Sequence, residues 1–537
     1  MRNKKLQVWL PLILSVCMVS GMFIGYRIKG NMPNAGIFFI DRQRPVQEVL
    51  DLVSRKYVDK EDEDSLGDAA IEAILAKLDP HSVFLPPREL KEVNEDLEGK
   101  FFGIGVEFNI FNDTINVLNV LPNGPSDKAG LMVGDKFLKV GDSIITGKNI
   151  TAEKIKNLLR GTGGSKADIT ILRNRTEKVI SITRGYIPLY SLDAEYMITD
   201  SVGYIRLNKF SETTYKEFMQ AMENLQKQGM KSLILDLRDN GGGILTQATD
   251  IADEFLSDNK LITYTVGTHS PKKEYRCSKE GVFEKGKLVV LANEGTASAS
   301  EVLTGALQDW DRATVMGRRS FGKGLVQEQY QLNDGSGLRL TVARYYTPLG
   351  RSIQKSYKNG VDEYNKDLMN RFHSGEMTFA DSIKHTNEKE YKTNSGKTVY
   401  GGGGITPDIF VPYDTLAMDK EITLALIKGT LNSFIYRNYL AHREEFQFYK
   451  SPKIFQEKYH ADDATLKSLK DYAEMDSINF NLDDIKEKSL LQKQIKVMTA
   501  RQIWRTQGLY EVSNPDDETV NKALEFLKNS PLAQLGK

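Results

Sequence analysis

Apolar and polar positions along the chain alternate between strand-like and helical patterns. A short apolar run at 288–292 is typical of a buried parallel strand. It leads through small polar residues into apolar positions at helical spacing, which predict a helix: Val302, Leu303, Ala306, Leu307 and Trp310. The same reasoning predicts a helix at 214–228 and further strands at 202–207, 232–237, 313–316 and 325–332. Strands interleaved with helices predict an α/β unit, which we place at residues 186–415.

The remaining regions follow other patterns and predict a multidomain α/β (α+β) chain. Residues 42–97 carry two helical apolar stripes, so we assign 36–97 to an N-terminal helical domain. Residues 98–185 combine glycine turns, alternating strands and one short helix at 152–160, which predicts a small β-rich domain. Residues 416–537 are helical and strongly charged, and we expect a C-terminal helical domain there.

The N-terminus begins with a basic segment, residues 1–5, which an apolar run from Leu6 to about Tyr26 follows. About twenty apolar residues, at a rise of about 1.5 Å each, are long enough to span a bilayer. We therefore predict a single-pass signal-anchor within residues 1–29, held in the cytoplasmic membrane. The basic start predicts that the rest of the chain lies outside the cytoplasm, in a periplasm or wall space.

Composition adds few constraints on partners. The chain has 537 residues, of which 40% are apolar, so it can bury several conventional cores. The 72 acidic and 72 basic residues balance, and we expect no nucleic-acid partner. Cys277 is the one cysteine outside the apolar N-terminal run, which contains Cys17. A disulfide-stapled fold is therefore excluded. We interpret Cys17 as an apolar filler of that run and Cys277 as structural or incidental, with a nucleophile as the alternative.

Ser298 stands where the predicted strand at 288–292 passes into the helix that follows. Backbone N–H groups at the start of a helix lack partners, and they can stabilise an oxyanion on a bound substrate. Ser298 is followed by Ala299 and, three positions on, by Glu301. Because Ser-x-x-Glu is also a capping box, this turn by itself predicts a structural cap as readily as a nucleophile.

Lys323 lies between two glycines, and Gln327 follows four positions later. A lysine in a glycine loop is most often solvated. If it is buried beside Ser298, desolvation lowers its pKa from about 10.4 and leaves a neutral amine that can act as general base. Gln327 would then orient the amine. Gly241, Gly242 and Gly243 follow another predicted strand and can expose N–H groups, although a glycine triplet is more often only a loop.

These motifs together resemble the C-terminal processing peptidases, also called tail-specific proteases. The segments that carry the resemblance are 78–85, 296–301, 321–327, 345–354 and 403–411. The resemblance implies a crotonase-like α/β core with Ser298 as nucleophile, Lys323 as base and Gln327 holding the lysine. It also implies an oxyanion hole made by the N–H of Ala299 and one glycine from Gly241, Gly242 or Gly243. Asp239 stands where asparagine is common in the family.

Residues 98–185 resemble the β-barrel-like PDZ domain of the same family. Such a domain accepts a peptide as an added strand and holds its terminal carboxylate in backbone N–H groups. The resemblance places this binding site at Gly103, Ile104, Gly105 and Val106. A β-rich adaptor without a ligand is the alternative. We also expect an adaptor protein as a partner and homo-oligomers through 416–537, for which a solvated spacer is the alternative.

The sequence thus predicts a membrane-anchored serine endopeptidase that binds protein C-terminal tails and cleaves extracytoplasmic proteins, with no cofactor and no metal. One alternative is a non-catalytic PDZ scaffold on a peptidase-like core. A Ser/His/Asp hydrolase is another, for which three histidines fall within the core: His269, His373 and His385. His81, in an Asp-Pro-His-Ser turn, receives a structural role. The polar segment 355–399 has little periodicity, and we expect a surface flap there.

Overall fold

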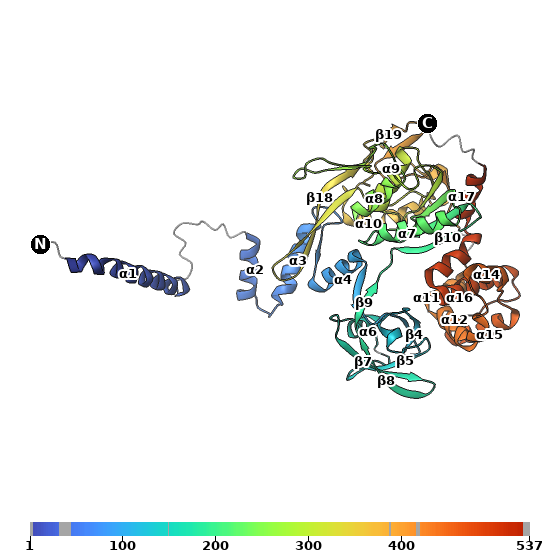
Figure 1. Cartoon of the computed structure of the whole chain (residues 1–537), viewed down its shortest axis with the longest axis horizontal. Coiled ribbons are helices and arrows are strands. Elements are labelled where there is room, and N and C mark those ends of the chain that lie inside the picture. The colour runs from blue at the N-terminus through green and yellow to red at the C-terminus, as the bar shows by residue number, and fades with distance from the viewer. Residues whose placement is uncertain (1–3, 32–44, 149, 386–387, 415–418, 530–537) are drawn as a thin grey trace. The chain divides into compact units, whose positions relative to one another are not determined.

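The computed structural model describes residues 4–31, 45–148, 150–385, 388–414 and 419–529 (Figure 1). The chain splits into two compact units, Met1–Ile74 and Leu75–Lys537. The first unit contains α1 (Lys4–Asn31), α2 (Pro45–Lys56) and most of α3 (Glu63–Leu75). The boundaries expected at residue 36 and between residues 415 and 416 lie outside the described residues.

The predicted membrane anchor is not supported. Among the described residues, no helix is both long and apolar enough to cross a lipid bilayer. The helix α1 covers much of the segment in which the anchor was expected, and it includes Pro11, whose missing N–H interrupts the helical hydrogen-bond pattern.

The centre of the second unit is a six-stranded sheet in the order β10-β11-β12-β15-β16-β21. These strands are β10 (Leu192–Met197), β11 (Val202–Leu207), β12 (Ser232–Asp236), β15 (Lys287–Ala292), β16 (Thr314–Gly317) and β21 (Ile409–Phe410). β10 is antiparallel to β11, and the other neighbours are parallel. The apolar runs predicted as strands are confirmed, and β11 and β15 are buried along their whole lengths.

Helices cover this sheet on both faces, as a mostly parallel sheet requires. One face packs against α7 (Thr214–Lys227), α8 (Leu245–Asp253) and α9 (Ala299–Asp309). The other face, which includes Tyr204 and Val289, packs against α17 (Glu518–Asn529). The predicted α/β organisation is therefore confirmed, and α17 belongs by its contacts to the sheet rather than to the helices that precede it.

A second sheet of the same unit contacts α8 and α9 through its strand β13. It has the order β1-β18-β13-β14, and β17 pairs with β18. Its strands are β1 (Val83–Leu85), β13 (Leu261–Val266), β14 (Lys273–Arg276), β17 (Leu325–Gln331) and β18 (Gly337–Tyr346). The helix α4 (Pro87–Glu98) follows β1. Among the described residues β17 pairs with β18 alone, so its other edge is open.

The predicted β-rich domain forms a five-strand path with one short side strand. The order is β3-β4-β5-β7-β8, with β6 paired to β5. Its elements are β3 (Val106–Phe111), β4 (Thr114–Val120), α5 (Pro125–Lys128), β5 (Lys136–Val140), β6 (Ser143–Ile144), α6 (Ala152–Leu159), β7 (Lys166–Arg173) and β8 (Thr176–Thr183). β2 (Lys100–Gly103) and β9 (Gly185–Pro188) pair separately. Because β3 and β8 do not pair within the described residues, the sheet is open, which corrects the barrel-like form expected.

Segment 355–399 is more regular than the flap expected. It contains α10 (Val361–His373), η1 (Ala380–Ser382), β19 (Lys389–Lys392) and the start of β20 (Thr398–Gly401). Tyr364 and Arg371 on α10 are buried, and Arg371 donates to the carbonyl of Ser320 at 2.8 Å. The sequence showed little periodicity here because polar contacts to the core, rather than an apolar stripe, hold this helix.

The C-terminal region is helical, as predicted. It consists of α11 (Lys420–Ile427), α12 (Thr430–Ala441), α13 (Arg443–Phe446), α14 (Pro452–Lys458), α15 (Asp463–Ala473), η2 (Glu474–Asp476), α16 (Ile485–Ser513) and η3 (Asn514–Asp516). Its main apolar cluster includes Leu431, Phe480 and Ile495, all fully buried or nearly so.

Candidate active site

Ser298 occupies a sharp turn between β15 and α9, at the carboxyl end of the parallel sheet. Its backbone angles are φ 56° and ψ −118°, outside the regions that non-glycine residues ordinarily adopt. Such strain persists only where the surrounding structure holds it, and it clusters at functional sites. A sharp passage from strand to helix also lifts the serine side chain out of the backbone, and Ser298 lines an open cleft.

Glu301 connects the serine turn to the lysine loop. Its Oε2 accepts from the backbone N–H of Ser298 at 2.9 Å and from that of Lys323 at 2.8 Å. Its Oε1 accepts from the N–H of Gly322 at 2.7 Å and from Ser320 Oγ at 2.5 Å. Glu301 is fully buried, and this burial raises its pKa to about 7. The capping carboxylate expected from the sequence thus also fixes the spacing of the two predicted catalytic residues.

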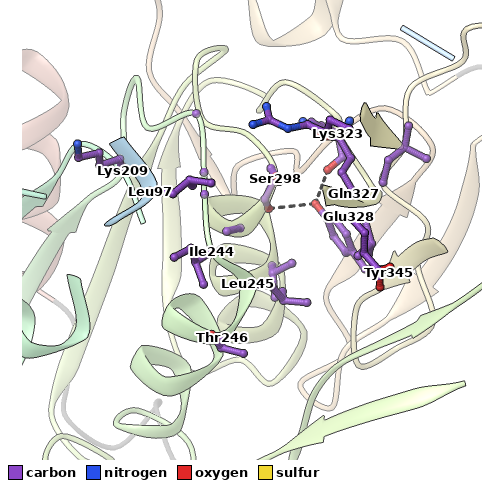
Figure 2. A pocket seen from close by; sticks show the side chains of 18 of the residues that line it. Leu97, Lys209, Ile244, Leu245, Thr246, Ser298, Lys323, Gln327, Glu328 and Tyr345 are labelled. Atoms are coloured by element: carbon purple, nitrogen blue, oxygen red, sulfur yellow. Dashed lines mark hydrogen bonds between the residues drawn. The ribbon is translucent and has the colours of Figure 1, made fainter. Parts of the chain in front are cut away.

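Tyr345 makes a second connection between the same two segments. Its hydroxyl lies 2.6 Å from the carbonyl oxygen of Lys323 and 3.1 Å from that of Ser298, as the dashed lines in Figure 2 indicate. Tyr345 is buried on β18, and burial raises the pKa of its phenol well above the usual value, so it stays a hydrogen-bond donor. Sequence reasoning missed this role because the acceptors are backbone carbonyls, which have no residue signature.

Lys323 has the environment that a neutral amine needs. Desolvation, followed by the charge of Arg339, lowers the pKa of Lys323 from 10.5 to about 8. Its Nζ donates to Gln327 Oε1 at 2.8 Å, the contact expected from their four-residue spacing. Ser298 and Lys323 line the same cleft of about 700 Å³ (Figure 2). Among the described residues no hydrogen bond joins Ser298 Oγ to Lys323 Nζ, and the amine is instead hydrogen-bonded to Gln327.

Gln327 is itself held by the Asp-Pro-His-Ser turn. Its Nε2 donates to the carbonyl oxygen of His81, which leaves Oε1 directed at the lysine. Asp79 Oδ1 fixes that turn, because it accepts from the N–H of His81 at 2.8 Å and of Ser82 at 2.9 Å. Burial, and then the charge of Lys323, lowers the pKa of His81 to about 4, so its ring is neutral. The structural role expected for His81 therefore includes a carbonyl contact to the site.

The three glycines expected at the oxyanion hole differ in their surroundings. A side chain at Gly242 would meet Ser298 Cβ at 2.7 Å and the nitrogen of Ala299 at 2.9 Å, so this backbone lies against the serine turn. The N–H of Gly242 already donates to Asn240 Oδ1 at 2.9 Å. Within the described ranges, the N–H groups of Ala299, Gly241 and Gly243 donate to no protein atom. These three groups are consequently the available donors.

The backbone at position 239 can accept aspartate in place of the asparagine that is common in the family. It has φ 61°, in the left-handed region where asparagine and aspartate are both enriched. Its N–H donates to Asn293 Oδ1 at 2.8 Å, and Asn293 Nδ2 donates back to Asp239 Oδ1 at 2.7 Å.

No histidine is among the residues that line the described part of the cleft. His269, His373 and His385 are therefore not brought to Ser298, and the Ser/His/Asp alternative loses its base. His385 Nδ1 instead contacts Glu388 at 2.6 Å in segment 355–399.

The expected peptide site of the β-rich domain lies between β2 and β3. Gly105 has φ +76°, and the Ile104 carbonyl accepts from the N–H of Ser126 at 3.0 Å. The side chain of Ile104 is 2% exposed and packs in the domain core, so this residue can offer a ligand only its backbone. β3, which begins at Val106, has an open edge within the described residues.

Comparisons with known proteins give matches over the core, the β-rich domain and part of the C-terminal region. Residues 201–363 match peptidase family S41, 103–183 match the PDZ domain family, and 424–505 match a family of unknown function. The carboxy-terminal-processing protease of Bartonella bacilliformis is 34% identical over 313 residues, which cover 57% of this chain and 71% of that protein. The carboxyl-terminal-processing protease of Picosynechococcus sp. is 34% identical over 383 residues, which cover 66% and 89%.

A solved photosystem II D1 C-terminal processing protease is 27% identical, covering 70% of this chain and 89% of its own, with a TM-score of 0.34. The matches to family S41 and to the PDZ family define the class as a serine-type peptidase that carries a PDZ domain. Within that class, the chain belongs to the carboxy-terminal-processing proteases.

Proposed function

We propose that the chain is a serine endopeptidase with a Ser298/Lys323 catalytic dyad. The observation that carries the proposal is the position of Lys323: its amine is largely buried in the cleft that Ser298 lines, and its pKa is lowered to about 8. An amine with a pKa near the working pH is both deprotonated often enough and basic enough to take a proton. The proposal also covers the roles of Gln327 and of the oxyanion donors.

The chemistry begins with the movement of the lysine side chain from Gln327 Oε1 toward Ser298 Oγ. Neutral Lys323 accepts the hydroxyl proton while Oγ bonds to the scissile carbonyl carbon. The tetrahedral intermediate collapses as the ammonium gives its proton to the leaving amine, which departs and leaves an acyl-enzyme. A water then attacks the ester carbon and gives a proton to Lys323. As the bond to Oγ breaks, the ammonium returns that proton to Ser298 Oγ, and the new carboxyl end is released. Gln327 holds the amine between these transfers.

The oxyanion is stabilised by backbone N–H groups at the start of α9 and in the glycine triplet. Ala299 N–H is one donor, and the second comes from Gly241 or Gly243, since Gly242 N–H is engaged by Asn240. Each such donor is worth about 3 kcal/mol of transition-state stabilisation in other hydrolases.

The PDZ domain provides the tail recognition. We propose that a substrate C-terminus adds as a strand to the open edge of β3, with its carboxylate on the N–H groups of Gly103–Val106. A segment upstream of that terminus then enters the Ser298 cleft in extended form.

Casein degradation tests the dyad. The wild-type chain should degrade casein, whereas the Ser298→Ala and Lys323→Ala variants should not. Lys272 is an exposed lysine in the loop between β13 and β14, and the control variant Lys272→Ala should match wild type. A variant without Ser298 Oγ that still cleaves would refute the proposal. A wild-type chain that binds tails without cutting any protein would favour the non-catalytic scaffold.

Three further expectations concern the setting of the enzyme. We propose substrates outside the cytoplasm on the basis of the N-terminal sequence, and cell fractionation tests this. We propose self-association through the C-terminal helices, which sedimentation of the purified chain tests, and an adaptor protein, which crosslinking in cells tests.

A further inference from the structure

Arg339 is a cation of the active-site cleft whose charge helps to lower the pKa of Lys323, but the proposed chemistry gives its guanidinium no contact with the substrate. It lies on β18, where it pairs with Gln329 of β17, while Gln327 pairs with Thr341. Because side chains two positions apart share one face of a strand, Arg339 and Gln327 are diagonal neighbours on the same face of the sheet. Arg339 lines the cleft together with Ser298 and Lys323. The side chain of Arg339 is therefore one cross-strand pair away from that of Gln327, whose amide holds the Lys323 amine.

Within the described residues, the charge of Arg339 has no paired counter-charge. Across the part of the chain that the structure describes, its guanidinium forms no ion pair, hydrogen bond or cation–π contact, although the side chain is half-buried. Burial lowers its pKa, and no carboxylate opposes this effect. The contrast with Arg351 is informative: that fully buried arginine pairs with Asp309 at 2.5 Å. A half-buried charge without a partner costs free energy, and a bound anion would offset that cost.

Three carboxylates near the cleft have hydrogen-bond or ion-pair partners other than Arg339. Asp79 accepts four hydrogen bonds, from the N–H groups of His81 and Ser82 and from the hydroxyls of Ser82 and Thr341. Asp96 pairs with Lys209 at 2.6 Å, and Glu328 accepts from Tyr330 at 2.6 Å. Among the described residues, none of these carboxylates forms a hydrogen bond or an ion pair with Arg339.

We propose that Arg339 forms an anion subsite beside Ser298 and Lys323, and that this subsite binds a carboxylate of the peptide substrate. A planar guanidinium matches a carboxylate with two parallel hydrogen bonds, a fit that an ammonium lacks. The carboxylate comes either from an aspartate or glutamate close to the scissile bond or from the free C-terminus. The inference rests on the proposed function, and it makes Arg339 a specificity-determining residue of that site.

Paired peptides test the subsite. The probes are alanine–valine peptides with one glutamate moved through every position, each matched by the same peptide with glutamine, and each made with a free and an amidated C-terminus. The wild-type chain, Arg339→Gln and Arg339→Lys are compared by kcat/KM, with cleavage sites read by mass spectrometry. Binding of the same pairs to Ser298→Ala gives a second measurement that does not need turnover.

We expect one register in which the wild-type chain prefers glutamate by about tenfold or more, the value of one charge-assisted contact. The ratio of kcat/KM for the glutamate peptide to that for the glutamine peptide should fall close to one in Arg339→Gln and should be only partly reduced in Arg339→Lys. If amidation instead removes the preference, and does so only when Arg339 is present, the carboxylate is the C-terminus. An amidation effect that survives in Arg339→Gln belongs to the PDZ domain.

A pH profile separates the subsite from a purely structural role. A carboxylate bound to Arg339 offsets the charge that lowers the pKa of Lys323. The midpoint of kcat against pH should therefore lie higher for the glutamate peptide than for its glutamine partner, and the two should coincide in Arg339→Gln.

The outcomes distinguish the inference from the proposed function. Equal cleavage and equal binding of both partners at every register and terminus, with cleavage lost in Ser298→Ala, would overturn the subsite and leave the peptidase intact. A preference unchanged in Arg339→Gln would overturn it as well. Cleavage that persists in Ser298→Ala would overturn the proposed function and, with it, the inference.

Discussion

The titration of Lys323 gives the sharpest test of the proposed chemistry. Only the neutral amine can take the proton of Ser298, and burial lowers its pKa from 10.5 to about 8. At pH 7 about one-tenth of the molecules then carry a neutral amine, compared with about one in 3,000 for an ordinary lysine. The fold thus raises the population of active enzyme by about 300-fold at neutral pH.

The expected pH profile follows directly from this pKa. For a peptide without acidic residues, kcat/KM should rise about tenfold per pH unit below pH 8 and level off above it. Arg339→Gln should move the midpoint upward, because removal of a neighbouring positive charge makes protonation of Lys323 easier. Initial rates of a fluorogenic peptide at constant ionic strength measure both, and circular dichroism at each pH shows that the fold is kept.

Two results would refute this reasoning. A midpoint near the ordinary lysine value would mean that the amine is not desolvated in the working enzyme. Activity of Lys323→Arg would be as damaging, since a guanidinium keeps its proton throughout this range and cannot act as the base. Lys323→Arg is a strict variant because it keeps the positive charge and roughly the length of the side chain.

Three further predictions concern the dyad and the groups that hold it. Glu301→Ala should lower kcat at least about a hundredfold and destabilise the fold by about 2–4 kcal/mol, because it leaves buried N–H groups without an acceptor. Peptide kinetics and urea unfolding measure these two effects, and wild-type activity of the variant would contradict the prediction. Asp79→Asn should reduce kcat by about tenfold with little change in KM, since it loosens the turn whose carbonyl fixes Gln327; a change confined to KM would argue against this positioning role. Lys323→Met should be more stable than wild type at pH 7, by up to about 3 kcal/mol. Between pH 10.5 and about 8 the unfolded wild-type chain binds a proton at Lys323 that the folded chain does not. The stability of the wild type therefore falls as pH falls through this window, and the unfolding curves of the two proteins should converge near pH 10.5.

The local features of this site were predictable from sequence because they depend on neighbouring residues. Apolar runs identified β12, β15 and β16, and the passage from strand to helix identified the Ser298 turn. The four-residue spacing of Lys323 and Gln327 predicted their contact. Where polar contacts replace apolar periodicity, as in α10, the pattern did not predict the helix. The sheet of the PDZ domain was expected in a more closed form, and strand patterns do not specify which edges pair.

Only the tertiary structure decided how the dyad is held and charged. The Glu301 carboxylate accepts from N–H groups of two loops, and the carbonyl of His81 accepts from Gln327, which lies 246 positions later in the chain. Backbone donors and acceptors carry no residue signature, so the contacts of Glu301 with the lysine loop and of Gln327 with His81 cannot be inferred from residue types. The pKa of Lys323 depends on burial and on the charge of Arg339, both set by how distant strands pack. Sequence therefore determined which groups are available, and folding determined their distances, desolvation and charge.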